Sequence, residues 1–212
     1  MTASRLSLYN DALLELGLRG IVSLTESRES RRVLDTAWNG GAVEYCLEQG
    51  FWEFAIRSQM MTYDPSISTD FGYQYGYGKP DDYIRTYAFC SDENFDNPIL
   101  RYADEATVWY TDHDTIYVQY VSDDEDYGLN YSAWPETFAQ LVVTYLASLV
   151  CVRLTQSASK KEKIDKDLEK AITDARSKSA MNKPTKFLHP GTWSSARNRG
   201  RWGSFHAVLP ST

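Results

Sequence analysis

Apolar residues recur at spacings of three and four near the beginning of the chain, which predicts an amphipathic first helix. Ser4 or Ser7 can cap the start of this helix, and Gly17 or Gly20 can end it. One face of the helix is therefore expected to pack into a core. The apolar positions of that face are Leu6, Tyr9, Leu13, Leu14 and Leu16.

A second helix is predicted from about residue 30 to residue 49, with Gly50 as its C-terminal stop. The pair Gly40 and Gly41 interrupts its pattern, and each glycine costs roughly 1 kcal/mol relative to alanine inside a helix. This pair therefore indicates either a kink or the close packing of another backbone.

Between residues 51 and 121 the pattern changes to the alternation of side chains that is typical of β-strands. The turn at 112–114 is predicted to join the last two strands as a hairpin. The segment 71–78 is predicted as a loop with exposed aromatic side chains. The stretches predicted as strands are residues 54–61, 83–89, 99–102, 107–110 and 116–121.

The helical period returns after the strands. Residues 138–152 show a broad apolar face with few charges, which predicts a centrally buried helix of about 20 residues. Ser159 and Glu162 match the spacing of a capping box. They are expected to open an amphipathic helix that carries Ile164 and Leu168 on its apolar face.

These patterns predict an α+β fold: a bundle of about four helices with an inserted antiparallel β-sheet region and an extended C-terminal tail. Proline and glycine residues after Met181 exclude a long helix there. The predicted parts are N-terminal helices at 1–50, the β insertion at 51–131, C-terminal helices at 132–181 and the tail at 182–212.

Charge is distributed unevenly along the 212 residues. The tail holds five basic and no acidic side chains, so it carries +5 of a total charge of −7, and residues 1–181 carry −12. A body this acidic repels the phosphates of nucleic acid over most of its surface. The tail therefore differs from the rest of the chain in the sign of its charge.

The composition is ordinary for a soluble protein, with 42% hydrophobic residues. We find no apolar run of the ~20 residues that span a membrane and no signal-peptide pattern, so we expect no membrane contact and no general secretion. Cys46, Cys90 and Cys151 are odd in number and widely spaced. This argues against a disulfide framework or a zinc site, and for synthesis in a reducing compartment.

No residue pattern in the chain predicts catalysis, and the common nucleotide-binding and hydrolase motifs are absent. His113 lies between two acids in a turn, where neighbouring side chains do not converge on a metal. The acidic run 123–126 does not fit a calcium-binding loop. Glu44 and Glu48 have helical spacing, which is far more typical of a charged surface than of acid–base catalysis. We expect no enzymatic activity, no metal and no cofactor.

Basic and aromatic residues interleave in the tail. Arg197, Arg199 and Arg201 lie between Trp193 and Trp202, a pattern typical of segments that stack on bases and contact phosphates. Arginine and tryptophan are also enriched at the hot spots of protein interfaces. These residues therefore leave three interpretations open: a tail that binds a partner protein, a nucleic-acid-binding module and a tail without a binding role.

Several short segments follow one another in a characteristic order. They are residues 9–17 (YNDALLELG), Ile21 with 23–26 (SLTE), Leu47 with 51–55 (FWEFA), 79–85 (KPDDYIR), 115–120 (TIYVQY), 134–138 (WPETF) and 146–147 (LA). In this order they resemble the head-to-tail adaptor proteins of short-tailed double-stranded DNA phages, also called tail tubular protein A. The likeness covers about residues 6–181.

The resemblance implies a structural virion protein of the neck or tail region, made in the host cytoplasm. Such adaptors form a ring, usually of twelve copies, beneath the portal protein. A nozzle protein similar to tubular protein B docks on the far side, and double-stranded DNA passes through the centre without specific binding. The family's C-terminal extension clasps the portal. This implies portal-binding roles for Phe187, Trp193, Arg197, Arg199, Arg201, Trp202 and Phe205.

A ring contact is head-to-tail and needs two different surfaces on each subunit. The hairpin 107–121 and the loop 71–78 are candidates for contacting a neighbour or the nozzle, and an ordinary sheet and loop is the alternative. Acids within 92–126, or Glu44 and Glu48, are hypothesised to face the channel or neighbouring subunits and to keep DNA sliding. The candidate contact residues are Tyr73, Tyr75, Tyr77, Asp112, His113 and Asp114.

Overall fold

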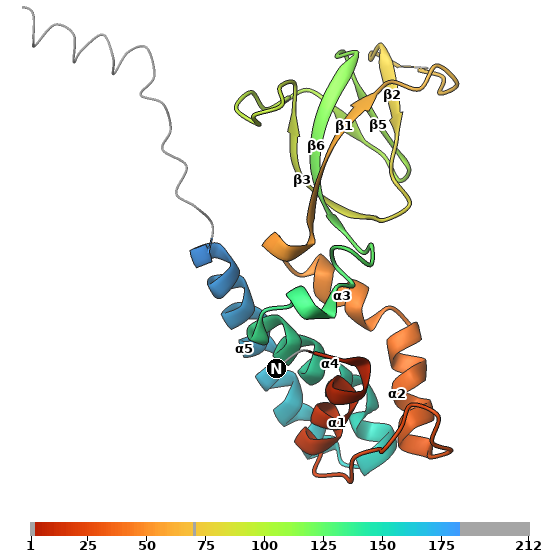
Figure 1. Cartoon of the computed structure of the whole chain (residues 1–212), viewed down its shortest axis with the longest axis vertical. Helices are drawn as coiled ribbons and strands as arrows, with labels where there is room; N and C mark the ends of the chain where they lie inside the picture. The colour runs from red at the N-terminus through yellow and green to blue at the C-terminus, as the bar shows by residue number, and fades with distance from the viewer. Residues whose placement is uncertain (1–2, 70, 183–212) are drawn as a thin grey trace, which may run out of the picture. The chain divides into compact units, whose positions relative to one another are not determined.

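The computed structural model describes residues 3–69 and 71–182, which combine helices with antiparallel sheets. Helices occupy both ends of this part of the chain and strands lie between them, so the prediction of a mixed fold is confirmed (Figure 1). The helices are α1 (Arg5–Glu15), α2 (Glu29–Asn39), α3 (Ala42–Glu48), α4 (Glu136–Thr155) and α5 (Ala158–Asn182), with short 3-10 turns η1 (Glu53–Ala55) and η2 (Tyr131–Ala133).

Helix α1 begins at the predicted cap. The Ser4 hydroxyl accepts a hydrogen bond from the Ser7 N–H, and the Ser7 hydroxyl accepts one from the Ser4 N–H at 2.9 Å. Leu13 is fully buried in the core, as expected. Leu14 is 73% exposed, so its predicted place on the apolar face is wrong, because adjacent helical positions lie about 100° apart.

The predicted second helix is divided into α2 and α3 at Gly40 and Gly41. Gly41 has a φ of +88°, a left-handed conformation that glycine adopts without steric cost. Within the described part of the chain, no distant backbone lies within 4 Å of where a Cβ would sit at either glycine. Close packing of another backbone is therefore wrong, and the glycine pair does more than kink one helix, because it ends α2 and begins α3.

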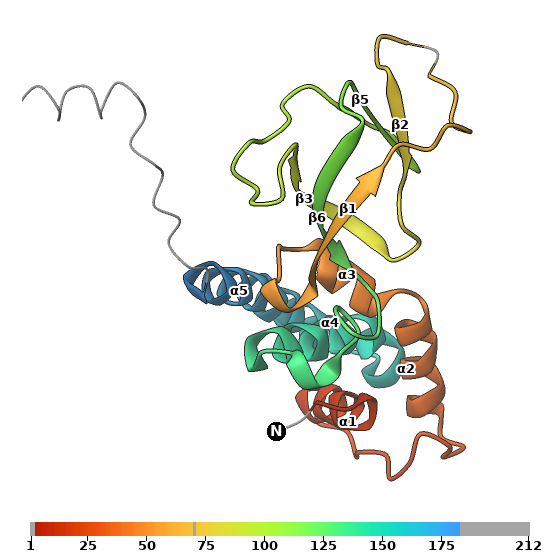
Figure 2. The ribbon, with the colours of Figure 1, turned by 45° about the horizontal axis from the view of Figure 1, so that its top comes forward.

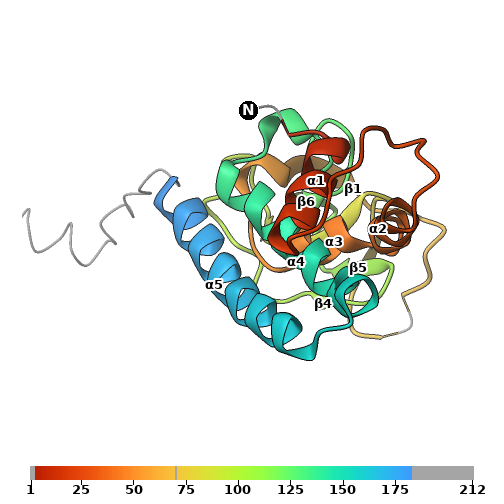
Figure 3. The same cartoon turned by 90° about the horizontal axis from the view of Figure 1, so that it is seen from below.

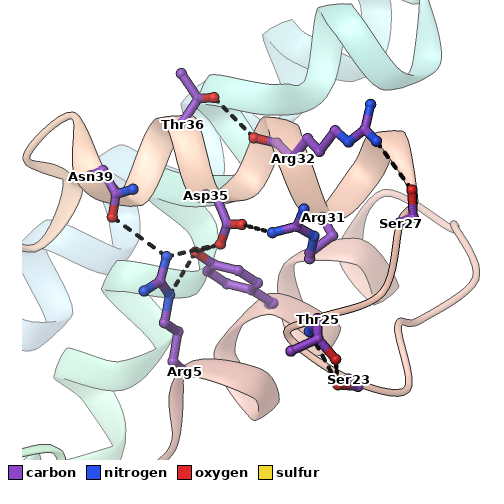
Figure 4. A network of polar contacts seen from close by, with 10 residues as sticks. Arg5, Ser23, Thr25, Ser27, Arg31, Arg32, Asp35, Thr36 and Asn39 are labelled. Atoms are coloured by element: carbon purple, nitrogen blue, oxygen red, sulfur yellow. Dashed lines mark hydrogen bonds and ion pairs between the residues drawn. The ribbon is translucent and has the colours of Figure 1, made fainter.

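A polar network joins α1 to α2 (Figure 4). The Asp35 carboxylate accepts hydrogen bonds from Arg5 at 2.8 Å and from the Tyr9 hydroxyl at 3.0 Å, and a further one from Arg31. Tyr9 is fully buried, and this burial raises the pKa of its hydroxyl, so the phenol stays protonated and keeps donating to Asp35. The network therefore links α1 to α2 through side-chain hydrogen bonds.

Helix α4 is the central helix of the helical region, as its apolar face predicts, and it packs against α1, α2 and α3. It is also the one helix in the described ranges that is long and apolar enough to cross a membrane, so the expectation that no segment meets this criterion is wrong. More than half of its apolar window, 56%, is buried inside the structure, which is the environment of a core helix.

Helix α5 starts one residue before the predicted capping serine. The Lys160 N–H donates to the Ser157 hydroxyl at 3.3 Å, so Ser157 and not Ser159 caps the first turn. Ile164 and Ala175 are buried against the core, and Leu168 is partly buried beside them. The predicted amphipathic helix is confirmed.

The strands form two three-stranded antiparallel sheets (Figure 2). In the first sheet β6 lies between β1 and β3, and Ile56 pairs with Val121. In the second sheet β5 lies between β2 and β4, and Tyr77 pairs with Trp109. The strands are β1 (Ile56–Thr62), β2 (Tyr75–Gly78), β3 (Tyr83–Cys90), β4 (Ala103–Asp104), β5 (Val108–Thr111) and β6 (Thr115–Ser122).

Three strand predictions need correction. The hairpin at 107–121 is wrong, because β5 and β6 belong to different sheets and the turn at 112–114 carries the chain from one sheet to the other. Residues 99–102 are not a strand, and β4 follows them. The loop predicted at 71–78 contains strand β2, whose glycines conceal the strand pattern.

Two hydrophobic cores are present. The helical core contains residues of all five helices together with Trp52, Val121 and Trp134. The second core lies within the β region and takes residues from both sheets. Its buried members are Tyr77, Phe89, Ile99, Trp109, Ile116, Val118 and Tyr120.

Candidate interaction surface

Three loops lie at the same end of the β region, because β1 and β3 run toward that end and β6 starts from it (Figure 1). We call the described residues of loops 63–74, 91–98 and 112–114 the distal surface. These loops contain no lysine or arginine. Their described acidic side chains are Asp64, Asp92, Glu93, Asp96, Asp112 and Asp114.

Local hydrogen bonds hold two of these acids in their charged form. The Asp92 carboxylate accepts from the backbone N–H groups of Asp96 at 3.0 Å and Asn97 at 2.8 Å, which lowers its pKa. The Asp64 carboxylate accepts from the hydroxyl and the N–H of Ser66, which lowers its pKa as well. The distal surface therefore keeps negative charge in mildly acidic solution.

Of the three candidate tyrosines, the structure places Tyr77 inside the protein. Its ring is fully buried in the β core and its hydroxyl donates to the carbonyl oxygen of His113, so it cannot contact a partner and the expectation for it is wrong. Burial raises the pKa of this hydroxyl, which preserves the donor. Tyr77 instead fixes the turn that presents Asp112 and Asp114 to solvent.

Tyr73 and Tyr75 are half-buried near the distal surface. The Arg101 guanidinium lies 5.6 Å from the Tyr73 ring centre, and the Tyr75 ring lies 4.8 Å from that of Tyr63. Asp112, His113 and Asp114 are exposed, as expected of a solvated turn. Their roles in contacting a neighbour or a nozzle stay predictions.

A half-buried carboxylate at the opposite end of the β region was not predicted from the sequence. Asp82 accepts hydrogen bonds from Ser122 at 2.5 Å, Arg57 at 2.9 Å and Tyr120 at 3.2 Å. Burial opposes its charge, but these donors outweigh burial and lower its pKa. Arg57 also lies 3.7 Å from Asp124, so the cluster ties β1, β3 and β6 to the loop that leads to α4.

The sequence signal for this cluster was weak. Asp81 and Asp82 are adjacent acids in a predicted loop, and the sequence does not distinguish them. In the structure Asp82 is half-buried beside strands β1 and β6, whereas Asp81 is exposed. Asp82 has the geometry of a structural anchor, because all of its donors belong to neighbouring strands.

Glu44 and Glu48 are exposed on α3, outside the β region. Arg85 of β3 donates to the backbone carbonyl of Glu48 at 3.3 Å and not to its carboxylate. Both carboxylates lie along one side of a short helix, so they add negative charge beside the β region.

Counted by region, the negative excess of the chain is confined to residues 51–131. That region holds sixteen acidic and four basic side chains, a charge of −12. Residues 1–50 carry −2 and residues 132–181 carry +2, so the helical parts are neutral together. The fold thus joins a strongly anionic β region to an electrically balanced helical region.

Within residues 3–69 and 71–182, no group of three or more histidine, cysteine, aspartate or glutamate side chains could hold a metal ion. Cys46, Cys90 and Cys151 are all buried, and burial raises the pKa of the Cys46 thiol. His189 and His206 lie outside the described residues.

The candidate portal-binding residues also lie outside the described part of the chain. They are Phe187, Trp193, Arg197, Arg199, Arg201, Trp202 and Phe205. In comparisons with known proteins, no family model and no curated protein matches the chain.

Proposed function

We propose that this protein is a structural component of a virion, a head-to-tail adaptor that joins a portal vertex to a tail nozzle and lets DNA pass. In this proposal the helices form a bundle of about four helices around α4, and copies of it assemble into a ring. The β region is inserted into this bundle, and residues 182–212 bind the portal. The ordered segments within residues 6–181 that resemble such adaptors support the proposal.

The observation that carries the proposal is the segregation of charge. The β region carries −12, whereas the tail carries +5. A DNA duplex presents about one negative charge per 1.7 Å, so a basic wall would retain it by releasing counterions. An anionic wall repels the duplex, and a conduit needs that property. The lowered pKa values of Asp64 and Asp92 support a charge that persists.

The direct test uses portal rings made from the portal protein of the same genome. The full chain is mixed with these rings and imaged by electron microscopy, and an added layer beneath the portal is expected. A chain truncated after Asn182 should remain folded by circular dichroism but leave the rings bare. Full attachment of the truncated chain would refute the role of the tail, and absence of a layer with the full chain would refute the adaptor.

The alternative function is nucleic-acid binding through the three arginines and two tryptophans of the tail. An adaptor should show little affinity for duplex or single-stranded DNA at moderate salt. A binding module should bind with an affinity that falls steeply as salt rises. Replacing Arg197, Arg199 and Arg201 by glutamine would abolish that binding if the alternative is correct, whereas replacing Trp193 and Trp202 by alanine would remove stacking.

A second test concerns the acids of the channel wall. Neutralising Asp112 and Asp114 to asparagine should retard genome passage or retain DNA in assembled particles, because repulsion of the duplex is reduced. Neutralising Glu44 and Glu48 to glutamine provides the matched comparison on α3. Unchanged DNA ejection in both double variants would contradict an electrostatic role for these acids.

A further inference from the structure

Strand β1 is an edge of the first sheet, and its outer side is unpaired. It pairs with β6 over its whole length, from Ile56 opposite Val121 to Thr62 opposite Thr115, without a bulge. In an antiparallel pair every second residue directs its N–H and C=O groups away from the partner strand. Among the residues that the structure describes, the backbone of 57–62 forms hydrogen bonds with no segment other than β6. The outer backbone groups of β1 can therefore pair with a further strand.

The other sheet edges are protected or short. On the outer side of β2, the Asp64 N–H donates to the Gly76 carbonyl oxygen at 2.9 Å. On the outer side of β3, the Ile99 N–H donates to the Phe89 carbonyl oxygen at 2.8 Å, and the register of β3 against β6 shifts at two points. Strand β4 has two residues. Among the described strands, β1 is therefore the one long edge without a covering segment.

Edge strands of soluble proteins usually carry charged side chains, a proline, a bulge or a covering helix that prevents pairing. Strand β1 contains no proline, and its one charged residue, Arg57, is held by Asp82 at 2.9 Å. The helices lie below the strands in Figures 1 and 2 and in front of them in Figure 3, and no described helix runs alongside β1. Such an edge is typical of a strand that accepts another strand from a partner.

The two faces of β1 define which side chains an added strand would meet. Met61 faces the β core, because its cross-strand partner Ile116 is fully buried and paired residues share a face. Met60 pairs with Tyr117 on the outer face and is 58% exposed. An added strand would place alternate side chains beside Met61 and beside Met60, so apolar or β-branched residues suit both of its faces.

The chain around β1 is anionic. Glu53 lies three residues before β1 and Asp64 lies two residues after it, and both are exposed. Hydrogen bonds from Ser66 lower the pKa of Asp64, so this carboxylate keeps its charge. Among the described residues, neither acid has an ion-pair partner. Negative charge therefore flanks the unpaired edge at both ends.

The β region has no basic side chain to spare for these acids. Its four basic residues are Arg57 beside Asp82, Lys79 beside Asp104, Arg85 over the Phe51 ring and Arg101 beside Asp112. A second copy of the chain would bring another β region of charge −12 against this one, which disfavours pairing between copies at β1. A cationic segment is attracted instead.

We propose that β1 binds an extended, cationic segment of a partner protein, which adds to the first sheet as a fourth strand. The backbone of the segment hydrogen-bonds the outer groups of residues 57–62, and its alternate side chains cover Met60 and Met61. Basic residues at its two ends face Glu53 and Asp64. This surface belongs to the β region alone, so the inference goes beyond the adaptor role and does not depend on it.

The test uses the full chain and the synthetic peptide RTVTVTVTVTR with blocked ends. Fluorescence anisotropy should show binding that weakens as salt rises, and bound peptide should slow hydrogen exchange at the outer amides of residues 57–62. The peptide with glutamate in place of both arginines should bind at least about tenfold more weakly. Failure of the arginine peptide to bind natively folded protein would overturn the proposal.

Backbone pairing is tested by two further peptides, N-methylated at alternate amides in the two possible phases. An added strand presents every second amide to β1, so one methylated peptide should lose at least about tenfold in affinity and the other should bind like the parent. Equal affinities of the two methylated peptides would exclude strand addition.

Charge reversal in the protein locates the site. Glu53→Lys with Asp64→Lys should weaken the arginine peptide at least about tenfold and allow the glutamate peptide to bind. The matched control is Glu93→Lys with Asp96→Lys, which changes the net charge equally on loop 91–98 beyond β3. This control should weaken the arginine peptide much less. Equal losses in the two variants, with native circular dichroism, would indicate general attraction to an anionic surface and would contradict a site at β1.

Other occupants of the edge give a different result. Outer amides of residues 57–62 that exchange slowly in the full chain without peptide would show that a second copy or another segment of the chain already covers β1, and the proposal would be wrong. None of these measurements involves portal rings, so the adaptor proposal stands or falls by its own experiment.

Discussion

Replacing Asp82 by asparagine tests how the β region is fastened to the rest of the chain. Its side chain is 16% exposed and accepts from Arg57, Ser122 and the fully buried Tyr120. Hydrogen bonds to a charged group contribute about 1.5–3 kcal/mol each, and the amide retains only part of this. We expect a loss of about 2–3 kcal/mol in the free energy of unfolding at pH 7. In a chain of this size the melting temperature should fall by about 5–10 °C.

The pH dependence follows from the direction of the pKa shift. Because the folded-state pKa of Asp82 is lowered, its stabilisation is present above the unfolded pKa of about 3.9 and is lost as the pH falls through the folded value. Urea unfolding followed by tryptophan fluorescence should therefore show the stability difference between wild type and D82N narrowing as the pH falls below about 3.9. The exposed neighbour provides the control D81N. Equal destabilisation by D82N and D81N would refute the reasoning. So would a stability difference between wild type and D82N that stays the same from pH 7 to pH 3.

Three further predictions concern packing. Gly128→Ala should lower the free energy of unfolding by at least about 2 kcal/mol, because a Cβ there would lie 2.1 Å from the Ser122 carbonyl oxygen. Gly78→Ala is the control and should leave the stability unchanged, because nothing lies within 4 Å of its Cβ position. Equal urea midpoints for the two variants would contradict this prediction. Leu13→Ala should cost about 2–5 kcal/mol and Leu14→Ala under about 0.5 kcal/mol, since only the first is buried, and calorimetry that ranks them alike would be inconsistent with α1 as described. The buried thiols of Cys46, Cys90 and Cys151 should react with a thiol reagent only after denaturation, so rapid labelling of native protein would argue against their burial.

The helices could be predicted from the sequence because apolar spacing and capping residues lie within each helix. The apolar period and the Ser4 cap placed α1, and the charge-poor face of 138–152 identified the central helix. The pairing of strands was less predictable, since β5 pairs with β2, which is distant in sequence, as well as with the neighbouring β4. The turn at 112–114 was interpreted as a hairpin turn, but it connects β5 of one sheet to β6 of the other.

The candidate surface was predictable in part. The exposed turn at 112–114 followed from its polar composition, and the structure bears out its exposure. Tyr77 could not be distinguished from Tyr73 or Tyr75, because alternate tyrosines in a glycine-rich segment look alike until register with Trp109 places one of them inside. Leu149 and Val152 are exposed, although the apolar face of residues 138–152 predicts a centrally buried helix.

The presence of two cores has a consequence for how such a chain can change. The polypeptide leaves the helical region near Ile56 and returns near Val121, and these two residues are paired neighbours in one sheet. A short turn joining those positions would bypass the whole of residues 57–120 while leaving Val121 in its place within the helical core. The β region can therefore be enlarged, replaced or removed as one insertion. We expect related chains to differ most in this insertion and to conserve the helical region.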